Sequence, residues 1–317
     1  MAEIGTDIDK AARLLKSGQL VAIPTETVYG LAGNALDPAA VTSIFTVKNR
    51  PSFDPLIVHI SDLEQAEKYV TRVPPPARLL AEAYWPGPLT LLMPKRKEVP
   101  DLVTAGMPDV GMRSPAHPLT RQLLASLPFP LAAPSANPFG YISPTHPTHV
   151  NEQLGDKIAY ILDGGTCAVG IESTVIGFPT DAEAVVYRMG GLSLEQIEAV
   201  ISKVEVRTHS TSNPRSPGQL RSHYAPSKKL ILGDPEVLLR EYSPSRAGVL
   251  SFSRKFDIPY QVILSEKGDL EEAARNFFEA LHTMEKLPVD IILAEPVPDT
   301  GLGRAINDRL RRAAAGD

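Results

Sequence analysis

Two cations at the end of a predicted helix are the first residues of this chain that could do chemistry. Lys48 and Arg50 flank the end of a helix predicted over 38–48, and Pro51 stops that helix. Lys48 lies four residues beyond Ile44, so it continues the inward-facing stripe of the helix. Such cations suit a phosphate or a carboxylate. Complementing the negative end of the helix dipole is the alternative, and periodicity alone favours it.

Further polar side chains follow apolar segments along the chain. They are Arg113, Ser135, Asn137, Ser143, Ser173 and Arg188. Single donors from several strand ends indicate a concave site for a polyphosphate or a carboxylate. Taken one by one, each arginine has the alternative of a surface ion pair, and the serine–asparagine segment has the alternative of an ordinary turn.

Other reactive residue types carry less weight. His146 and His149 have the spacing of a metal-binding pair, but such a pair in a proline-rich turn is usually structural, and no metal site is predicted. Cys167 is the single cysteine, which excludes an intrachain disulfide and an all-cysteine metal cage. The basic segment RLRRAA, residues 309–314, is interpreted as the solvated face of a helix.

Short apolar strands alternating with helices must position these side chains, which predicts an α/β protein. Strands are expected over 20–24, 55–60, 85–94 and 131–137, with others near 160, 175 and 186. In the strand over 55–60, His59 shares a face with Ile57, and a satisfied core histidine is its simpler interpretation. Helices are expected over 7–16, 38–48, 62–70 and 119–126, and Ser193 with Gln196 forms a capping box for another.

The composition changes at 207–228, which is polar and rich in serine and proline, and we interpret this segment as an interdomain linker. It divides the chain into an N-terminal domain over 1–206 and a C-terminal domain over 229–317. The C-terminal domain alternates strands with helices over 235–242, 270–287 and 304–314, which predicts a small α/β domain with a parallel sheet.

Composition excludes several classes of function. The 317 residues carry a net charge of −5 and a pI near 5.9, which argues against bulk electrostatic binding of nucleic acid. The acidic N-terminus is unlike a signal peptide, and no run of about 18 apolar residues predicts a membrane span. We therefore expect a cytoplasmic protein. The chain lacks a GxxxxGK[ST] loop, a GxGxxG after a strand, HExxH and CxxC.

A family resemblance changes these odds. The segments PTETVYGLAGNA, KNRP, PLIVHI, APSANPFG and IESTV, in this order, resemble the YrdC-type domain of L-threonylcarbamoyladenylate synthases. SPGQLRSHYAP and GLGRAINDRLRRAA resemble the long, two-domain form of that family. The resemblance implies a YrdC-like twisted open sheet with helices around a concave pocket, followed by a smaller Rossmann-like α/β domain.

The implied function is that of a nucleotidyltransferase. L-threonine, bicarbonate and ATP, with Mg²⁺, would give L-threonylcarbamoyl-AMP and pyrophosphate. The product would pass to a tRNA threonylcarbamoyl transferase that modifies the adenosine at position 37 of tRNA.

The family's motifs place both substrates on this chain. Lys48 and Arg50 would be the catalytic cations. The implied ATP contacts are Lys48, Arg50, Asp54, Ser135, Asn137, Ser143, Arg188 and Tyr224. The implied threonine contacts are Thr27, His59, Arg113, the backbone of Ala133, and Ser173. The linker carrying Tyr224 would fold over the pocket.

Two acids depart from the family's pattern. Asp54 and Asp109 stand where the family often has asparagine and threonine, so an acid replaces a neutral contact on the ATP side. A carboxylate there could instead help to hold Mg²⁺.

Other classes of function stay open. The chain could be a non-catalytic RNA-binding module, and weak RNA binding could also accompany catalysis. It could be a carbamoyl-transfer maturation factor, although one cysteine cannot build the zinc modules of such proteins. The C-terminal domain could serve only as a scaffold.

Overall fold

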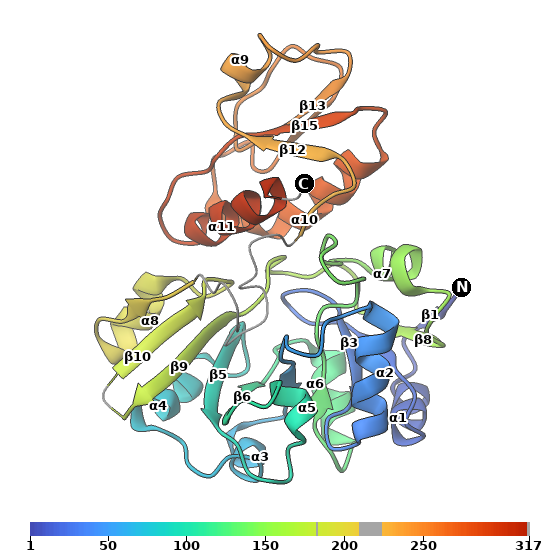
Figure 1. Ribbon diagram of the computed structural model, residues 1–317, viewed down its shortest axis with the longest axis vertical. Helices are drawn as coiled ribbons and strands as arrows, with labels where there is room; N and C mark the ends of the chain where they lie inside the picture. Colours follow the sequence, from blue (N-terminus) through green and yellow to red (C-terminus); the bar gives the residue numbers. More distant parts are fainter. Residues whose placement is uncertain (182, 209–223, 316–317) are drawn as a thin grey trace.

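The computed structural model describes residues 1–181, 183–208 and 224–315 and has two sheets, one of eleven strands and one of four (Figure 1). The large sheet has the order β1-β8-β2-β3-β7-β4-β6-β5-β9-β10-β11. Its strands are β1 Glu3–Gly5, β2 Val21–Ile23, β3 Gly30–Asn34, β4 Ile57–His59, β5 Leu89–Pro94, β6 Asp109–Arg113, β7 Leu131–Ala132, β8 Tyr160–Leu162, β9 Thr174–Thr180, β10 Glu183–Arg188 and β11 Glu205–Val206.

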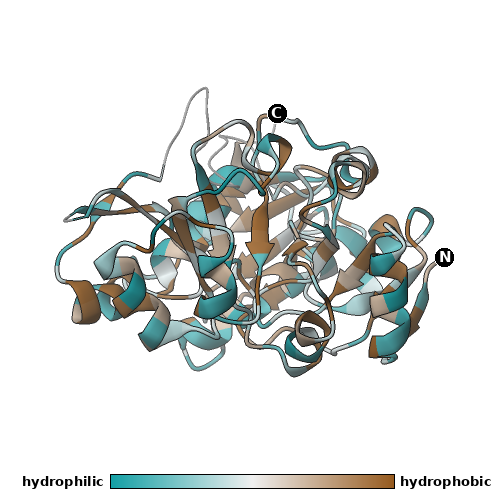
Figure 2. Ribbon diagram, turned by 90° about the horizontal axis from the view of Figure 1, so that it is seen from below, coloured by the Kyte–Doolittle hydropathy of each residue, from teal (hydrophilic) through white to brown (hydrophobic). Residues whose placement is uncertain are grey.

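Helices cover this mixed sheet, and the hydropathy colouring shows apolar strands in the interior (Figure 2). The helices of this part are α1 Ile8–Lys16, α2 Pro38–Lys48, α3 Leu63–Glu67, α4 Pro75–Tyr84, α5 Asp101–Thr104, α6 Pro118–Ala125, α7 Pro147–Leu154 and α8 Leu194–Ile201. The α/β fold class predicted from the sequence is confirmed.

Helix α2 follows its sequence signals from end to end. The Asp37 side chain accepts from the Ala39 amide at 2.9 Å, and Pro38 occupies the first turn. Asn49 ends the helix in the left-handed conformation with φ 52°, which asparagine tolerates better than most residues. Ile44 and Lys48 are both buried, so the predicted inward position of Lys48 is confirmed.

Four neighbouring strands form one continuous face beside the site. Ile57 of β4 pairs with Gly111 of β6, which pairs with Leu92 of β5, and Leu92 pairs with Gly177 of β9. A Cβ at Gly111 would contact both Leu92 and Ile57, so these two side chains flank the glycine on the same face of the sheet. Because glycine has no side chain, the sheet surface is lower at Gly111 than at its two neighbours.

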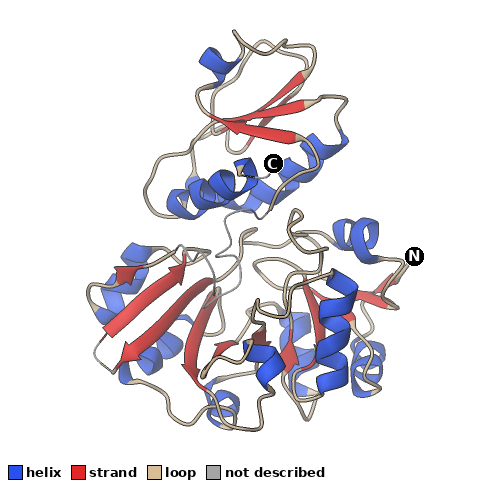
Figure 3. Ribbon diagram, in the orientation of Figure 1, coloured by secondary structure: helices blue, strands red, loops and turns tan. Residues whose placement is uncertain are grey.

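The small sheet has the order β12-β15-β13-β14, and each of its pairings is parallel, as predicted. Its elements are β12 Lys229–Leu232, α9 Pro235–Leu238, β13 Ala247–Ser251, β14 Gln261–Ile263, α10 Leu270–Lys286, β15 Ile291–Ala294 and α11 Gly303–Ala314. Helices α10 and α11 lie between the small sheet and the N-terminal part of the chain (Figure 3).

The interpretation of residues 309–314 as a solvated helix face was wrong. Within α11, Arg309 is fully buried and Arg312 is buried as well. Their charges are matched by Glu172 and Asp308, and the first of these partners is 137 residues away in the sequence. The helix is therefore charged on a face that packs against the N-terminal part.

The predicted linker is only partly described. Residues 209–223, and with them the expectation that this segment folds over the pocket, lie outside the described residues. The domain boundaries at 206 and 229 stay predictions. In the part of the chain that the structure describes, no helix is long and apolar enough to cross a membrane.

Candidate active site

A small cavity opens where β4, β6, β9 and β10 meet the loops after β2 and β7. Its volume is about 50 Å³. Its lining consists of Thr27, Val28, Arg50, Ile57, His59, Arg113, Ala133, Pro134, Ser135, Glu172, Ser173, Arg188 and Tyr224. Residues assigned to ATP and residues assigned to threonine therefore share one wall.

Arg113 is held in place by an acid that the sequence did not single out. Its Nη2 donates to Glu26 Oε1 at 2.8 Å, and the other oxygen of Glu26 accepts from the Ala116 amide at 2.9 Å. Both members of this ion pair are buried. The arginine at the end of β6 is thus fixed before any ligand binds, which favours recognition of a carboxylate.

His59 is buried beside Arg113, because β4 and β6 place the two residues opposite each other. Burial lowers its pKa to about 3, and the charge of Arg113 adds to this effect. The imidazole is therefore neutral at physiological pH. Its Nδ1 is buried without a hydrogen-bond partner among the described residues, so it is available to a ligand.

Ser173 and Arg188 form the side of the cavity that β9 and β10 provide. Arg188 donates from Nε to the Ser173 carbonyl and from Nη2 to the Ser173 hydroxyl, both at 3.0 Å. Thr90 Oγ1 lies 2.8 Å from the same hydroxyl. Burial lowers the pKa of Arg188 from its usual value, although an arginine stays charged.

Arg50 and Asp54 form a second buried ion pair at the cavity. Arg50 Nη2 lies 2.9 Å from Asp54 Oδ2 and donates to the Pro55 carbonyl at 2.9 Å. Burial raises the pKa of Asp54, while Arg50 opposes that rise. Arg50 lines the cavity and Asp54 lies behind it, fully buried.

Lys48 lies behind the cavity lining and contacts the turn that forms part of it. Its ammonium donates to the Ser135 carbonyl at 2.5 Å and also to the Asn137 carbonyl. Burial lowers the pKa of Lys48 well below its usual value, and Arg50 lowers it further. The Asn137 amide donates to the carbonyls of Pro138 and Tyr141, so the whole turn is fixed against the end of α2.

Ser143 also lies outside the lining, and it donates to Glu172 at 2.7 Å. Glu172 does line the cavity, although sequence reasoning missed it. It directly precedes Ser173 in the IESTV segment, which is the signal that could have found it.

Tyr224 forms the last part of the wall and is buried. It has a φ of 65°, an uncommon conformation for a bulky residue. Burial raises its pKa to about 12, so the phenol is neutral.

The Ala133 amide donates to the Ile57 carbonyl at 3.0 Å. The backbone contact expected at Ala133 would therefore be through its carbonyl oxygen. Thr27 shares a hydrogen bond of 2.8 Å with Thr25 at the turn after β2.

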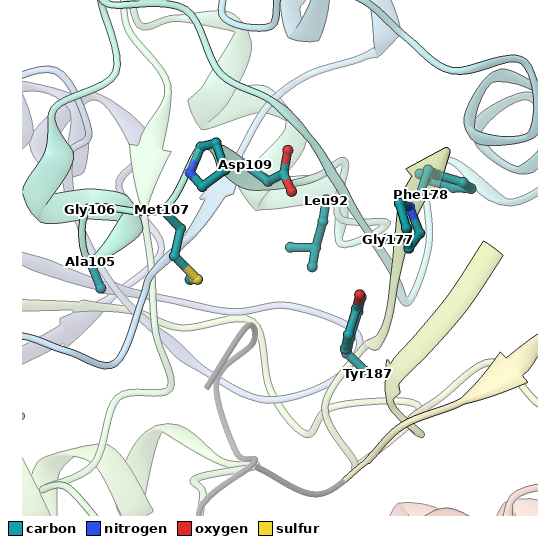
Figure 4. A pocket seen from close by; sticks show the side chains of 10 residues that line it. Leu92, Ala105, Gly106, Met107, Asp109, Gly177, Phe178 and Tyr187 are labelled. Atoms are coloured by element: carbon teal, nitrogen blue, oxygen red, sulfur yellow. The ribbon is translucent and has the colours of Figure 1, made fainter. Parts of the chain in front are cut away.

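A larger hollow of about 500 Å³ lies on the sheet face that carries Ile57, Gly111 and Leu92. Figure 4 shows the side chains that line it. Leu92, Met107, Asp109, Gly177 and Tyr187 contribute to its lining. Because Gly111 separates Leu92 from Ile57, the hollow and the cavity are neighbours along one row of the sheet. Asp109, the second acid that departs from the family's pattern, is one of the residues that line this hollow.

Comparison with known proteins first defines the class. The N-terminal part is a YrdC-type domain, because the Sua5–YciO–YrdC family model, described as telomere recombination, matches residues 13–190. A second model, described as the C-terminal domain of threonylcarbamoyl-AMP synthase, matches residues 192–315.

Full-length relatives define the particular family. A threonylcarbamoyl-AMP synthase of Pyrococcus abyssi is 43% identical over 96% of this chain and 93% of its own length. One of Bacillus subtilis is 42% identical over 98% of this chain and 93% of its own length. The structure of P. abyssi Sua5 complexed with L-threonine matches with a TM-score of 0.91 at 40% identity, covering 99% of this chain and 97% of that chain. The chain belongs to the threonylcarbamoyl-AMP synthase family and is an enzyme of the nucleotidyltransferase type.

Proposed function

We propose that this cavity and the adjoining hollow are where the chain converts L-threonine, bicarbonate and ATP into L-threonylcarbamoyl-AMP and pyrophosphate. One observation supports the assignment of residues to the two substrates. The single cavity wall contains Arg113 and His59 from the threonine set together with Arg50 and Arg188 from the ATP set. Two substrates that must react with each other would therefore meet at this wall.

On the threonine side, Arg113 binds the carboxylate and the Ala133 carbonyl accepts from the amino group. The fixed position of Arg113 against Glu26 supports this role. The partnerless Nδ1 of neutral His59 supports a hydrogen bond with the amino acid. Thr27 and Ser173, which also line the cavity, add hydroxyl groups.

On the ATP side, Arg50 and Arg188 contact the phosphates, with Ser135 at the turn and Tyr224 against the nucleotide. A cavity of about 50 Å³ has room only for water, whereas ligand pockets usually measure about 300–1,000 Å³. The hollow of about 500 Å³ beyond Gly111 supplies the missing space. Four residues of the implied ATP set lie outside the cavity lining and would act through the residues that form it: Lys48, Asp54, Asn137 and Ser143.

The reaction needs charge neutralisation and alignment more than a covalent nucleophile. Attack of the threonine amine on bicarbonate gives a carbamate and releases water. A carbamate oxygen then attacks the α-phosphorus of ATP, and the bond to the β-phosphate breaks with its electron pair leaving on pyrophosphate. Arg50, with Lys48 nearby, stabilises the charge that develops on these phosphates.

The described residues offer no ready set of Mg²⁺ ligands, so an ion would have to arrive bound to ATP. Glu172 is the one acid in the described lining, and its oxygens already accept from Ser143 and Arg309. The described residues contain no group of three potential metal ligands. Mg²⁺ commonly binds substrate phosphates and water with few protein ligands, and there it would supply charge neutralisation. Asp54 is an unsuitable ligand because it lies behind Arg50.

Beyond the reaction itself, we propose that the product passes to a tRNA threonylcarbamoyl transferase. The mixed anhydride reacts readily with water, so a direct transfer would protect it. Weak RNA binding and a cytoplasmic location belong to the same proposal.

The test is release of pyrophosphate by the full chain. We expect release only when threonine, bicarbonate and ATP are all present, and a much lower rate with serine. Release that does not require threonine or bicarbonate would contradict the proposal. Binding of tRNA with a steep salt dependence and no pyrophosphate release would favour the RNA-binding module.

A further inference from the structure

An arginine of the C-terminal part contacts the wall of the cavity. Arg309 of α11 donates from both Nε and Nη2 to Glu172 Oε2, each at 3.1 Å. The other oxygen of Glu172 accepts from Ser143 at 2.7 Å. Glu172 thus connects α11 with the residues around the nucleotide site.

The Arg309 side chain is fully buried, and its remaining contacts fix it in one position. Nη1 donates to the Met189 carbonyl at 2.5 Å and to the Ala305 carbonyl at 3.3 Å. The guanidinium lies 5.6 Å from the centre of the Tyr224 ring, within the range of a cation–π interaction. Two lining residues, Glu172 and Tyr224, therefore contact the same buried cation.

The same helix also contacts the chain on the other side of residues 209–223. Arg312 donates from Nη2 to the Thr208 carbonyl at 2.9 Å, and Asp308 orients it through two contacts of 2.9 and 3.0 Å. Helix α11 thus binds the chain at Thr208 as well as at Tyr224. Within the described residues, α11 therefore fixes both Thr208 and Tyr224.

We propose that Arg309 is a positioning residue of the active site, through which the C-terminal part holds Glu172 and Tyr224 in place for ATP. This inference rests on the proposed function. A buried carboxylate next to the phosphates of ATP would repel them, and it stays charged at low cost only beside a fixed cation. Arg309 neutralises that carboxylate, and Glu172 in turn orients the Ser143 hydroxyl.

Purely structural attachment of the two parts of the chain is the competing explanation, and Arg304 provides a matched control for it. Arg304 lies on the same helix and also pairs across to the N-terminal part, with Nη1 donating to Glu195 at 2.6 Å. Neither Arg304 nor Glu195 lines the cavity. Loss of Arg304 removes an ion pair between the parts, whereas loss of Arg309 removes the contacts to Glu172 and Met189 and leaves an acid of the cavity wall without its cation.

The test compares Arg309→Met, Glu172→Gln/Arg309→Met and Arg304→Met by the KM for ATP and the kcat of pyrophosphate release, with thermal midpoints measured in parallel. We expect Arg309→Met to raise the KM for ATP by about tenfold or more. The double variant should lower that KM again by about fivefold, because the uncompensated charge is gone. Arg304→Met should leave it unchanged.

Two results would overturn the inference while the wild type remains active. One is a folded Arg309→Met protein with an unchanged KM for ATP, and the other is a double variant as impaired as the single one. If Arg309→Met does not fold, Arg309→Gln takes its place, because glutamine loses the charge but keeps hydrogen-bond donors. An unchanged KM in that variant would equally overturn the inference. A wild type that releases no pyrophosphate would instead contradict the proposed function.

Discussion

Arg113 Nη2 donates to Glu26 Oε1 at 2.8 Å inside the cavity wall, and the same acid binds the Ala116 amide through its second oxygen. Removing the acid would leave the guanidinium without its fixed orientation. We expect Glu26→Ala to raise the KM for threonine on the order of tenfold, with a smaller change in the KM for ATP. Steady-state kinetics with each substrate varied in turn measure both values.

Glu26→Gln is the matched variant for this pair. An amide keeps one acceptor oxygen but loses the charge, so its KM for threonine should lie between those of the wild type and Glu26→Ala. Equal effects on the two KM values would show that Glu26 supports the fold in general and not Arg113 in particular.

Lys48 has two roles in this account, as a cation near the phosphates and as the link between α2 and the turn at 135–137. We expect Lys48→Ala to lower kcat/KM for ATP by about 10²–10³-fold while the protein stays folded. Lys10→Ala is the control, because Lys10 pairs with Glu3 at 2.5 Å on the surface. Full activity of Lys48→Ala would remove Lys48 from the ATP site.

The protonation of His59 gives a prediction for threonine binding. With its pKa lowered to about 3, the imidazole stays neutral from about pH 5 to pH 8. Threonine affinity should therefore show no inflection near pH 6.5. Calorimetric binding without bicarbonate is the suitable measurement, since bicarbonate itself takes up a proton in this range. An inflection that disappears in His59→Asn would contradict the neutral state.

A second buried histidine should affect stability. His282 of α10 stacks on His149 of α7 with ring centres 3.8 Å apart and contacts the Ser143 carbonyl at 3.1 Å. Burial lowers its pKa to about 4, and His149 lowers it further, while Glu279 opposes the shift. This histidine joins α10 to the N-terminal part of the chain.

The sign of the effect follows from proton binding. Between about pH 6.5 and pH 4 the unfolded chain holds a proton at His282 that the folded chain lacks, so this contribution is complete above pH 6.5 and is lost on acidification. Denaturant unfolding of the wild type should show that loss, on the order of 3 kcal/mol. His282→Gln should have a flatter pH dependence over this range. Identical slopes in both proteins would contradict the assignment.

Local signals predicted much of the fold and part of the site. The cap at Asp37, the capping box of Ser193 and Gln196, and the inward stripe ending at Lys48 depend on neighbours within a few residues, and each is present. The parallel order of the C-terminal strands followed from their alternation with helices.

Contacts between distant segments could not be predicted in this way. Glu26 is 87 residues from Arg113, and Glu172 is 137 residues from Arg309. A charged residue is assigned to the solvent-exposed surface when the sequence shows no nearby partner for it. The basic segment at 309–314 was misinterpreted for this reason. Glu26 lies in the PTETVYGLAGNA segment and Glu172 in the IESTV segment. The residue type alone does not show whether a glutamate there contacts a ligand or pairs with an arginine.

The central claim is that threonine, bicarbonate and ATP meet in one site, and isotope incorporation tests it most directly. The wild-type chain is incubated with ¹⁴C-bicarbonate, ³H-threonine and ATP, and the adenylate product is isolated. We predict a single product that carries both labels and AMP in equal amounts, formed together with one pyrophosphate. Arg113→Ala and Arg50→Ala should each abolish it. An adenylate carrying threonine without the carbon label, or pyrophosphate release without a labelled product, would contradict the account.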